Sequence, residues 1–358
     1  MKIKYFNYCF SLYIFFIFLS LIIFFFSTEK LQAKTFNVEN IEISEPFEID
    51  FDKNKVIDNG FKEAFEQLTS LIIKSTDQKK IDKIKLNRIK GMIETFTIKE
   101  EKFVNEIYYV NLGVSFNKKK IFEFLEEKNI FPAALNYEKF LFVPILIDEN
   151  KKELLIFSEN EFFNQWNISR QNYHLIEYLL PTEDLDDFNL IKKNYGNIEE
   201  FNFDGIIEKY NLENSIISLI FKNESQIRIL SKIMIKDDIS IKNQSFSNIN
   251  LKNETQIQEL ISQLKIIYED YWKNHNQINT SIKLPLSIQV KNVNEDRLSK
   301  FENVLSNIDL IYNFDITKLN KDSIYYEIIF NGTPDIFLKL MSNNDFHFNT
   351  QNRIWTLK

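Results

Sequence analysis

The chain has 358 residues, of which 44% are hydrophobic and 27% charged, and these values are typical of globular domains with a sizeable core. Its formal net charge is −7, and because residues 1–33 contribute +2, the remainder carries −9. That acidity excludes broad electrostatic binding to nucleic acid or to an anionic membrane surface, since both need a net basic face. Cys9 is the single cysteine, so residues 34–358 can form no disulfide and no cysteine-based metal site.

An apolar segment lies near the N-terminus. Residues 5–26 are long enough to span a bilayer, which needs roughly 20 apolar residues. The sequence Leu31-Gln32-Ala33 nevertheless offers a small residue at a cleavage position, and strand-like sequence follows at once. We expect a signal peptide that is cleaved after Ala33, and an uncleaved N-terminal membrane anchor through residues 5–26 is the alternative. Both interpretations place the rest of the chain outside the cytoplasm.

Residues 35–131 are predicted to form a β-α-α-β-β-α module. Alternating apolar residues predict a half-buried strand, and an apolar stripe beyond it predicts a helix in which Gly60 marks a close contact. Residues 79–92 indicate a second, basic helix, and two strands and a helix over 118–128 complete the module. The first strand uses Ile41, Ile43, Phe47, Ile49 and Phe51, the second Phe96 and Ile98, and the third Tyr108, Val110, Leu112, Val114 and Phe116.

Residues 138–276 are predicted to form an α/β module that ends in a long amphipathic helix. A buried strand over 140–148 is followed by a hairpin turn at 149–152 and a short second strand. Helical sequence then dominates to about residue 210, and three β-rich runs precede the final helix. At the start of that helix, Thr255 and Gln258 have the spacing of a capping box.

Residues 281–358 are predicted to form a ferredoxin-like module with the order β-α-β-β-α-β. The fold class is therefore α+β, with three small α/β modules in series after the N-terminal apolar helix. The interpretation of the last module depends on Asn294 as a helix cap with Glu295 and Asp296 in the first turn, on Leu310, Tyr312, Phe314 and Ile316 alternating along a strand, on Thr333 and Pro334 at a second helix start, and on a final turn at Gln351-Asn352.

Four acids within residues 180–188 form the one candidate metal cluster, because Ca²⁺ prefers several oxygen ligands. The spacing and glycine of an EF-hand are missing. A structural interpretation is favoured instead, in which a helix begins at Pro181 and Thr182 and its first-turn acids complement the helix dipole. The cluster consists of Glu183, Asp184, Asp186 and Asp187.

The three histidines, His174, His275 and His347, lie in distant segments, and none has a partner four residues away, which argues against a zinc site. His174 could serve as a general base, but no nucleophile motif, P-loop or dinucleotide fingerprint accompanies it. We therefore predict no catalytic residue and no cofactor.

The chain resembles a family of exported proteobacterial proteins of unknown function that is common in alphaproteobacteria. The resemblance runs over most of residues 35–358, through "KTFNVENIEIS", "NGFKEAFEQLTSLI", "IYYVNLGVSFNKKKIFEFLEEKNI", "FVPILID", "LLPTEDLDDF" and "NGTPDIFLKL". More faintly, the first module is similar to the N-terminal domain of flagellar assembly protein T, and the middle module to that of TolB. These likenesses imply envelope assembly modules rather than enzymes.

The leading hypothesis is thus an exported, periplasmic, non-catalytic protein that binds a protein partner in the cell envelope and no nucleic acid. The first alternative is a periplasmic hydrolase or metal-dependent enzyme that uses the acids at 183–187 with His174. The second is a structural subunit held in the inner membrane by residues 5–26.

Overall fold

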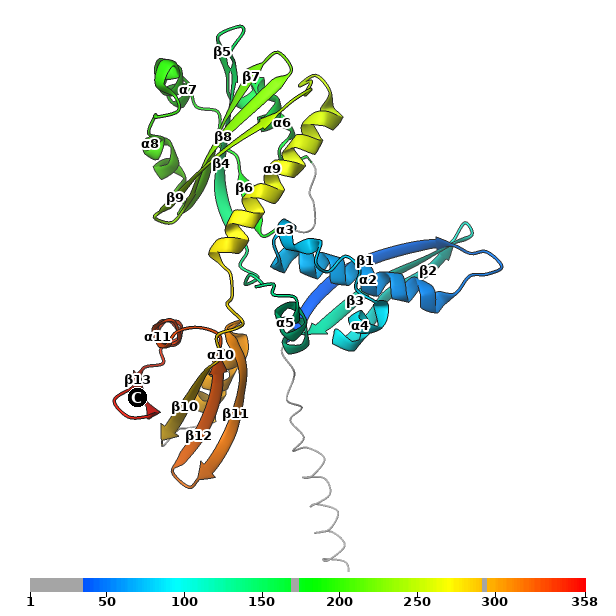
Figure 1. The fold of residues 1–358 in the computed structure, drawn as a ribbon, viewed down its shortest axis with the longest axis vertical. Coiled ribbons are helices and arrows are strands. Elements are labelled where there is room, and N and C mark those ends of the chain that lie inside the picture. Colours follow the sequence, from blue (N-terminus) through cyan, green and yellow to red (C-terminus); the bar gives the residue numbers. More distant parts are fainter. Residues whose placement is uncertain (1–34, 169–173, 292–294) are drawn as a thin grey trace, which may run out of the picture.

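The computed structural model describes residues 35–168, 174–291 and 295–358 (Figure 1). The apolar N-terminal segment, the cleavage position at Ala33 and the Asn294 cap lie outside these residues. Three β-sheets divide the described chain, and each has helices and a hydrophobic core of its own. The α+β class and the arrangement of three small modules in series are therefore confirmed. The helices in the described ranges include none that is both long and apolar enough to cross a membrane.

The first module is an antiparallel sheet with helices on one face. The strand order is β1-β3-β2, and the buried side chains of β1 and β3 pack against α2 and α5. In Figure 1 this sheet projects sideways from the rest of the molecule. Its elements are β1 (Thr35–Pro46), α2 (Lys53–Ile72), α3 (Ser75–Gln78), α4 (Leu86–Met92), β2 (Ile93–Val104), β3 (Ile107–Asn117) and α5 (Lys118–Glu127).

Two predictions for the first module are wrong in detail. The strand predicted to continue to residue 51 ends at Pro46, and Asp52 caps α2 by accepting from the Asn54 N–H at 2.9 Å. The basic helix predicted over 79–92 exists only from Leu86, because residues 79–85 form successive turns. Lysines at positions 79 and 83 would repel each other on a continuous helix, and such like-charge pairs destabilise it.

A β-bulge resets the alternation in β1. The pairing with β3 shifts between Val38 and Ile41, and Asn40 there has a φ of 60°. Phe36 and Val38 are buried before the bulge and Ile41 after it, so even and odd positions both reach the core.

Gly60 confirms the close contact expected of it. A Cβ atom built at this position in α2 would lie 2.4 Å from Cδ1 of Leu112, a fully buried residue of β3. The missing side chain therefore lets the helix approach the central strand of the sheet more closely than any other residue would allow.

The second module is a mixed sheet with the order β5-β4-β7-β8-β9, and β6 also pairs with β4. Strands β4 and β7 run parallel, and the predicted hairpin joins β4 to β5. Strand β6 was not predicted, since only four residues of it alternate within a segment of helical composition. The elements are β4 (Glu138–Asp148), β5 (Glu153–Leu155), α6 (Glu161–Gln165), β6 (Ile176–Leu179), α7 (Leu185–Lys193), α8 (Asp204–Ile207), the 3₁₀ turn η3 (Glu208–Tyr210), β7 (Asn214–Asn223), β8 (Gln226–Ile235), β9 (Asp238–Phe246) and α9 (Glu254–His275).

Both faces of this sheet are covered, which explains why β4 and β7 consist of continuous apolar runs. On one face, Phe140 and Phe142 of β4 pack with α6 and α9. On the other face, Leu141 and Val143 pack with residues of α7 and α8. The long helix α9 is capped by Asn253, whose side chain accepts from the Gln256 N–H, so the capping box predicted at Thr255 and Gln258 is wrong by two residues.

The third module has the predicted ferredoxin-like order. Its sheet runs β11-β12-β10-β14-β13, and β10 and β14 are parallel neighbours at its centre. Pro334 begins the second helix as expected, although Thr333 donates or accepts no capping bond through its side chain. Bulges in β11 leave Ile316 exposed, so the predicted alternation ends at Phe314. The elements are β10 (Leu284–Lys291), α10 (Glu295–Asn307), β11 (Ile311–Asn320), β12 (Ser323–Phe330), α11 (Pro334–Ser342), β13 (Phe348–Asn349) and β14 (Ile354–Leu357).

Polar contacts hold the modules against one another. The Ser75 N–H donates to Asp270 of α9 at 2.8 Å, which ties the first module to the second. Lys118 of α5 forms an ion pair with Asp309, and the Tyr312 hydroxyl donates to Glu123 at 2.7 Å, which ties the first module to the third. The first module is therefore central in the chain of contacts, with its sheet left free to project.

Candidate functional site

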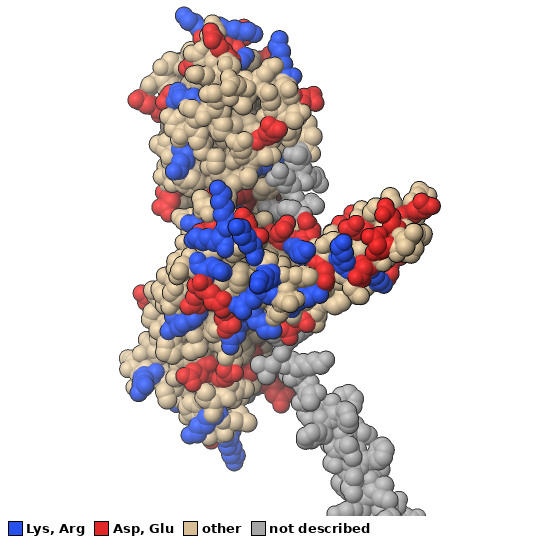
Figure 2. Space-filling model, turned by 45° about the vertical axis from the view of Figure 1, so that its right-hand side comes forward, with Lys and Arg blue, Asp and Glu red and all other residues tan. Residues whose placement is uncertain are grey.

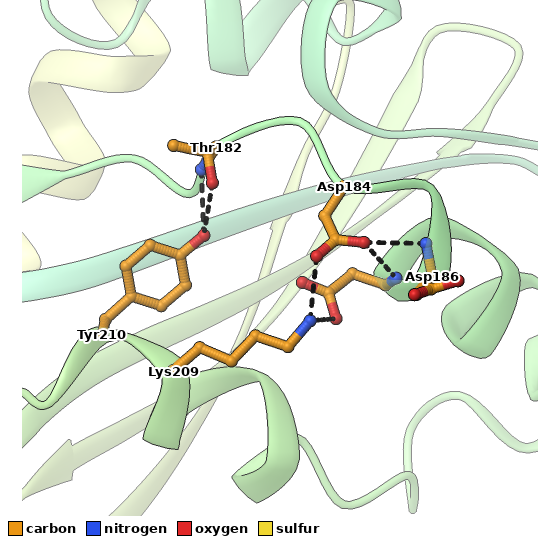
Figure 3. A network of polar contacts seen from close by, with 6 residues as sticks. Thr182, Asp184, Asp186, Lys209 and Tyr210 are labelled. Atoms are coloured by element: carbon orange, nitrogen blue, oxygen red, sulfur yellow. Dashed lines mark hydrogen bonds and ion pairs between the residues drawn. The ribbon is translucent and has the colours of Figure 1, made fainter.

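The predicted acidic cluster caps a helix. The Asp184 carboxylate accepts hydrogen bonds from the backbone N–H groups of Asp186 at 2.8 Å and Asp187 at 3.3 Å (Figure 3). Asp184 is the N-cap of α7, so the helix begins at Leu185 rather than at the predicted Pro181 and Thr182. These acids therefore stabilise the start of a helix as expected, but the helix starts at Leu185, three residues beyond Thr182.

Lys209 fills the position between two of the acids. Its Nζ lies 3.0 Å from Asp184 Oδ2 and 2.6 Å from Asp187 Oδ1, and Asp187 is buried (Figure 3). The hydrogen bond from Lys209, followed by those from the two backbone N–H groups, holds the pKa of Asp184 below its usual value of 3.8. The same carboxylates raise the pKa of Lys209. A lysine ammonium thus supplies the positive charge that a metal ion would bring.

The neighbouring residues complete a clamp rather than a reaction site. The Thr182 N–H donates to the Tyr210 hydroxyl at 2.9 Å (Figure 3). Glu183 accepts from the Ser158 N–H at 3.2 Å. In the described ranges, no group of three or more histidine, cysteine or acidic side chains is arranged to hold a metal ion. The cluster therefore joins the segment before α7 to η3.

His174 lies apart from the acidic cluster. Its Nδ1 is 3.5 Å from Glu269 Oε1 of α9, and the same oxygen accepts from the Ile176 N–H at 2.8 Å. Leu175 packs with α9 on one face of the six-stranded sheet, whereas Ile191 of α7 packs on the opposite face. The structure therefore does not bring His174 and the acids at 183–187 together. Tyr173, its neighbour in the sequence, lies outside the described residues.

The other two histidines occupy separate places. His275 stacks on Trp272 in the last turn of α9 with ring centroids 6.0 Å apart, and the His347 Nδ1 is 3.4 Å from the Ser342 hydroxyl. None of these contacts joins two of the histidines.

Three charged residues of α9 are buried, and the sequence prediction missed them. Lys265, Glu269 and Lys273 recur every four residues beside the apolar stripe, and this spacing was the available signal. Burial lowers the pKa of both lysines. Lys265 lies over the rings of Trp166 and Tyr178, and Lys273 donates to the Ser70 carbonyl of α2. Lys273 thus joins the second module to the first. Lys265 and Glu269 contact residues 166–178 of their own module.

The most exposed apolar side chains of the first module gather at the far end of its sheet. We call residues 35–52 and 93–117, which form β1, β2, β3 and their distal turns, the arm. Its tip comprises residues 46–51 and 103–107, and there Ile49 is fully exposed while Phe47, Phe103 and Val104 are about half exposed. The Phe47 ring contacts Phe103 and Phe51 with centroids 4.6 and 4.8 Å apart.

The sequence pattern misplaced these tip residues. Phe47 and Ile49 continue the alternation of Ile41 and Ile43, which predicts burial on the face of the sheet. Because β1 ends at Pro46, both residues fall in the turn beyond the core. Phe96 and Ile98 of β2 are also partly exposed, because α2 leaves this edge strand largely uncovered.

The comparisons with known proteins do not supply a function. No protein-family model matches the chain, and no curated protein matches it either. The arm, with its exposed tip, and the clamp at Asp184 and Lys209 are therefore judged on geometry alone. Of these two features, the arm is the one that presents apolar side chains with no evident role inside the fold.

Proposed function

We propose that this is a non-catalytic binding or assembly protein of the cell envelope, and that the arm is its docking element. The observation that carries the proposal is the exposed apolar tip. An isoleucine at the surface removes no apolar area from water, whereas burying it against a partner would contribute roughly 1.5–3 kcal/mol. Phe47 and Phe103, already packed against each other, would add a rigid aromatic anchor of the kind that dominates binding interfaces.

The shape of the arm supports the same function. Strand β2 forms the outer edge of the sheet, and within the described residues no strand pairs with its free side. The arm extends away from the other two modules, so a partner could reach its tip without displacing them (Figure 1). A projecting sheet with an apolar end is suited to recognising a protein rather than to enclosing a small substrate.

The hydrolase alternative has weaker support. Its acids contact Lys209 and backbone N–H groups, and its histidine lies on the other face of the sheet. A general base must lie within hydrogen-bond reach of the group it activates, and this arrangement offers no such pair.

The proposal includes the compartment and the resemblance. Export by residues 1–33 would place the arm in the periplasm, with the N-terminal segment either removed after Ala33 or kept as an inner-membrane anchor. The resemblance to exported proteobacterial proteins of unknown function is consistent with an envelope partner and with no role in binding nucleic acid. The net charge of −9 beyond residue 33 supports the last point.

Site-specific photo-crosslinking in intact cells tests the proposal. A photoreactive amino acid would replace Ile49 at the tip, and in a matched control it would replace Leu319, an exposed residue of β11 in the third module. We expect a protein adduct from position 49 and none from position 319. Equal adducts from both positions, or none from position 49, would contradict the docking role of the arm.

A further inference from the structure

Charge is segregated within the first module. The arm holds ten acidic residues and two lysines, a net charge of −8, whereas residues 53–92 hold ten basic and five acidic residues, a net charge of +5. Figure 2 shows the acidic side chains along the arm and the basic ones gathered near its base. The arm thus places a net charge of −8 next to a basic region of +5, whereas the much longer stretch 118–358 carries −7 in total.

The acidic tip of the arm and the basic turns at 79–85 lie at opposite ends of the first module. Helix α2 starts at the tip, next to Asp52, and ends at the base, next to the basic turns at 79–85. With 20 residues and a rise of about 1.5 Å per residue, it separates the regions by about 30 Å. The strands of the arm run along this helix and hold the tip at that distance.

Several of these charges are left without an opposite charge nearby. Lys99 pairs with Glu39 along the arm, and Lys53 pairs with Glu101. Within the described residues, the carboxylates of Glu48, Asp50 and Glu106 at the tip form no ion pair. At the base, Lys80 pairs with Asp77, but three other lysines of the turns form no ion pair in this part of the chain. Those basic side chains are exposed, and they are Lys79, Lys83 and Lys85.

We infer that the acidic tip of one molecule docks on the basic segment 79–90 of a second copy of this chain. The inference rests on the proposed function, because it names the partner of the same arm. Complementary charges orient the two copies and speed their encounter, and burial of Ile49, Phe47 and Val104 contributes affinity. Different surfaces meet in such a contact, so it is head-to-tail and extends to further copies unless a ring closes.

Sedimentation velocity of the purified full chain tests this contact. Association is expected at about 0.01 M salt, where charges act over about 30 Å, and its loss at about 1 M salt, where they act over about 3 Å. Glu48→Lys/Asp50→Lys at the tip, or Lys79→Glu/Lys83→Glu at the base, would each lower the association constant by about tenfold or more. The variant that combines all four changes would recover association, since its charges are exchanged rather than lost.

A matched control reverses two acids elsewhere. Asp237→Lys/Asp238→Lys lies on the exposed turn between β8 and β9, and it should leave association unchanged.

The inference is overturned if the unmodified chain stays monomeric at low salt, or if the four-fold variant fails to associate while its thermal melting is unchanged. An adduct from position 49 to a different protein, together with a monomeric chain, would retain the proposed function and reject the second copy as partner. If position 49 gives an adduct to a second copy of this chain and to no other protein, the second copy is retained as the partner and a separate envelope partner is rejected.

Discussion

Gly60 and Gly91 both lie in helices of the first module, but their surroundings differ. The Cβ of an alanine at position 60 would lie 2.4 Å from Leu112, whereas nothing lies within 4 Å of the corresponding position at Gly91. Leu112 is fully enclosed by the core and has little room to give way. Substitution by alanine should therefore lower the stability of the protein at position 60 and raise it at position 91.

We predict that Gly60→Ala lowers the free energy of unfolding by roughly 1–2 kcal/mol, because overpacking exceeds the gain in helix propensity. Gly91→Ala should raise it by roughly 0.5–1 kcal/mol, since only the propensity changes. Urea unfolding of both variants measures the difference. A stabilised Gly60→Ala variant would show that α2 does not approach β3 as closely as described.

At the residue scale, the sequence predicts the surroundings of a residue correctly where that residue has a single structural explanation. Gly60 interrupts an apolar stripe, and the close contact follows from that interruption. Phe47 and Ile49 fit an alternating pattern equally well whether the strand continues or ends. Their exposure depends on where Pro46 ends β1 and Asp52 begins the helix, which alternation alone does not specify.

The start of α7 is stabilised by a charge network that responds to pH. The pKa of Asp184 is lowered in the folded protein, so its contribution to stability is complete above the ordinary value of 3.8 and is lost as the pH falls through the folded-state value. The principal cause is the hydrogen bond from Lys209, and the backbone N–H groups of the cap add to it.

We predict that Lys209→Met lowers the urea midpoint at neutral pH and flattens its decline below about pH 4. Asp184→Asn is the matched variant, because asparagine still caps the helix but carries no charge. Asp184→Asn should also flatten the decline of the urea midpoint at low pH. At neutral pH it should lose less stability than Lys209→Met does. If the acid decline is as steep in Lys209→Met as in the unmodified protein, Lys209 does not set the pKa of Asp184.

At the element scale, long periodic segments were predicted well and short ones were not. The strands β4, β7, β8 and β12 follow from continuous or alternating apolar runs. Strand β6 depends on parallel pairing with β4, a contact between residues more than 30 positions apart that local sequence does not reveal. The cap of α9 was displaced because both Asn253 and Thr255 are good capping residues.

Over the whole molecule, the three-module order follows from the sequence, but the contacts between modules do not. The pair of Lys118 with Asp309 and the bond of Ser75 to Asp270 join residues nearly 200 positions apart. Lys118 is buried by this contact, and burial lowers its pKa, although a lysine in that basic run is ordinarily expected to be exposed. These contacts fix the body of the molecule and leave the arm projecting.

The central claim is that the tip of the arm serves binding and not folding. The most direct measurement compares the unmodified protein with Ile49→Ser/Val104→Ser in two assays, thermal or urea unfolding and crosslinking from position 47. Because both side chains are exposed, we predict a change in unfolding free energy within about 0.5 kcal/mol. Crosslinking should fall by about tenfold or more as the apolar contact is lost. A large loss of stability, or an undiminished crosslink in a stable variant, would contradict the account.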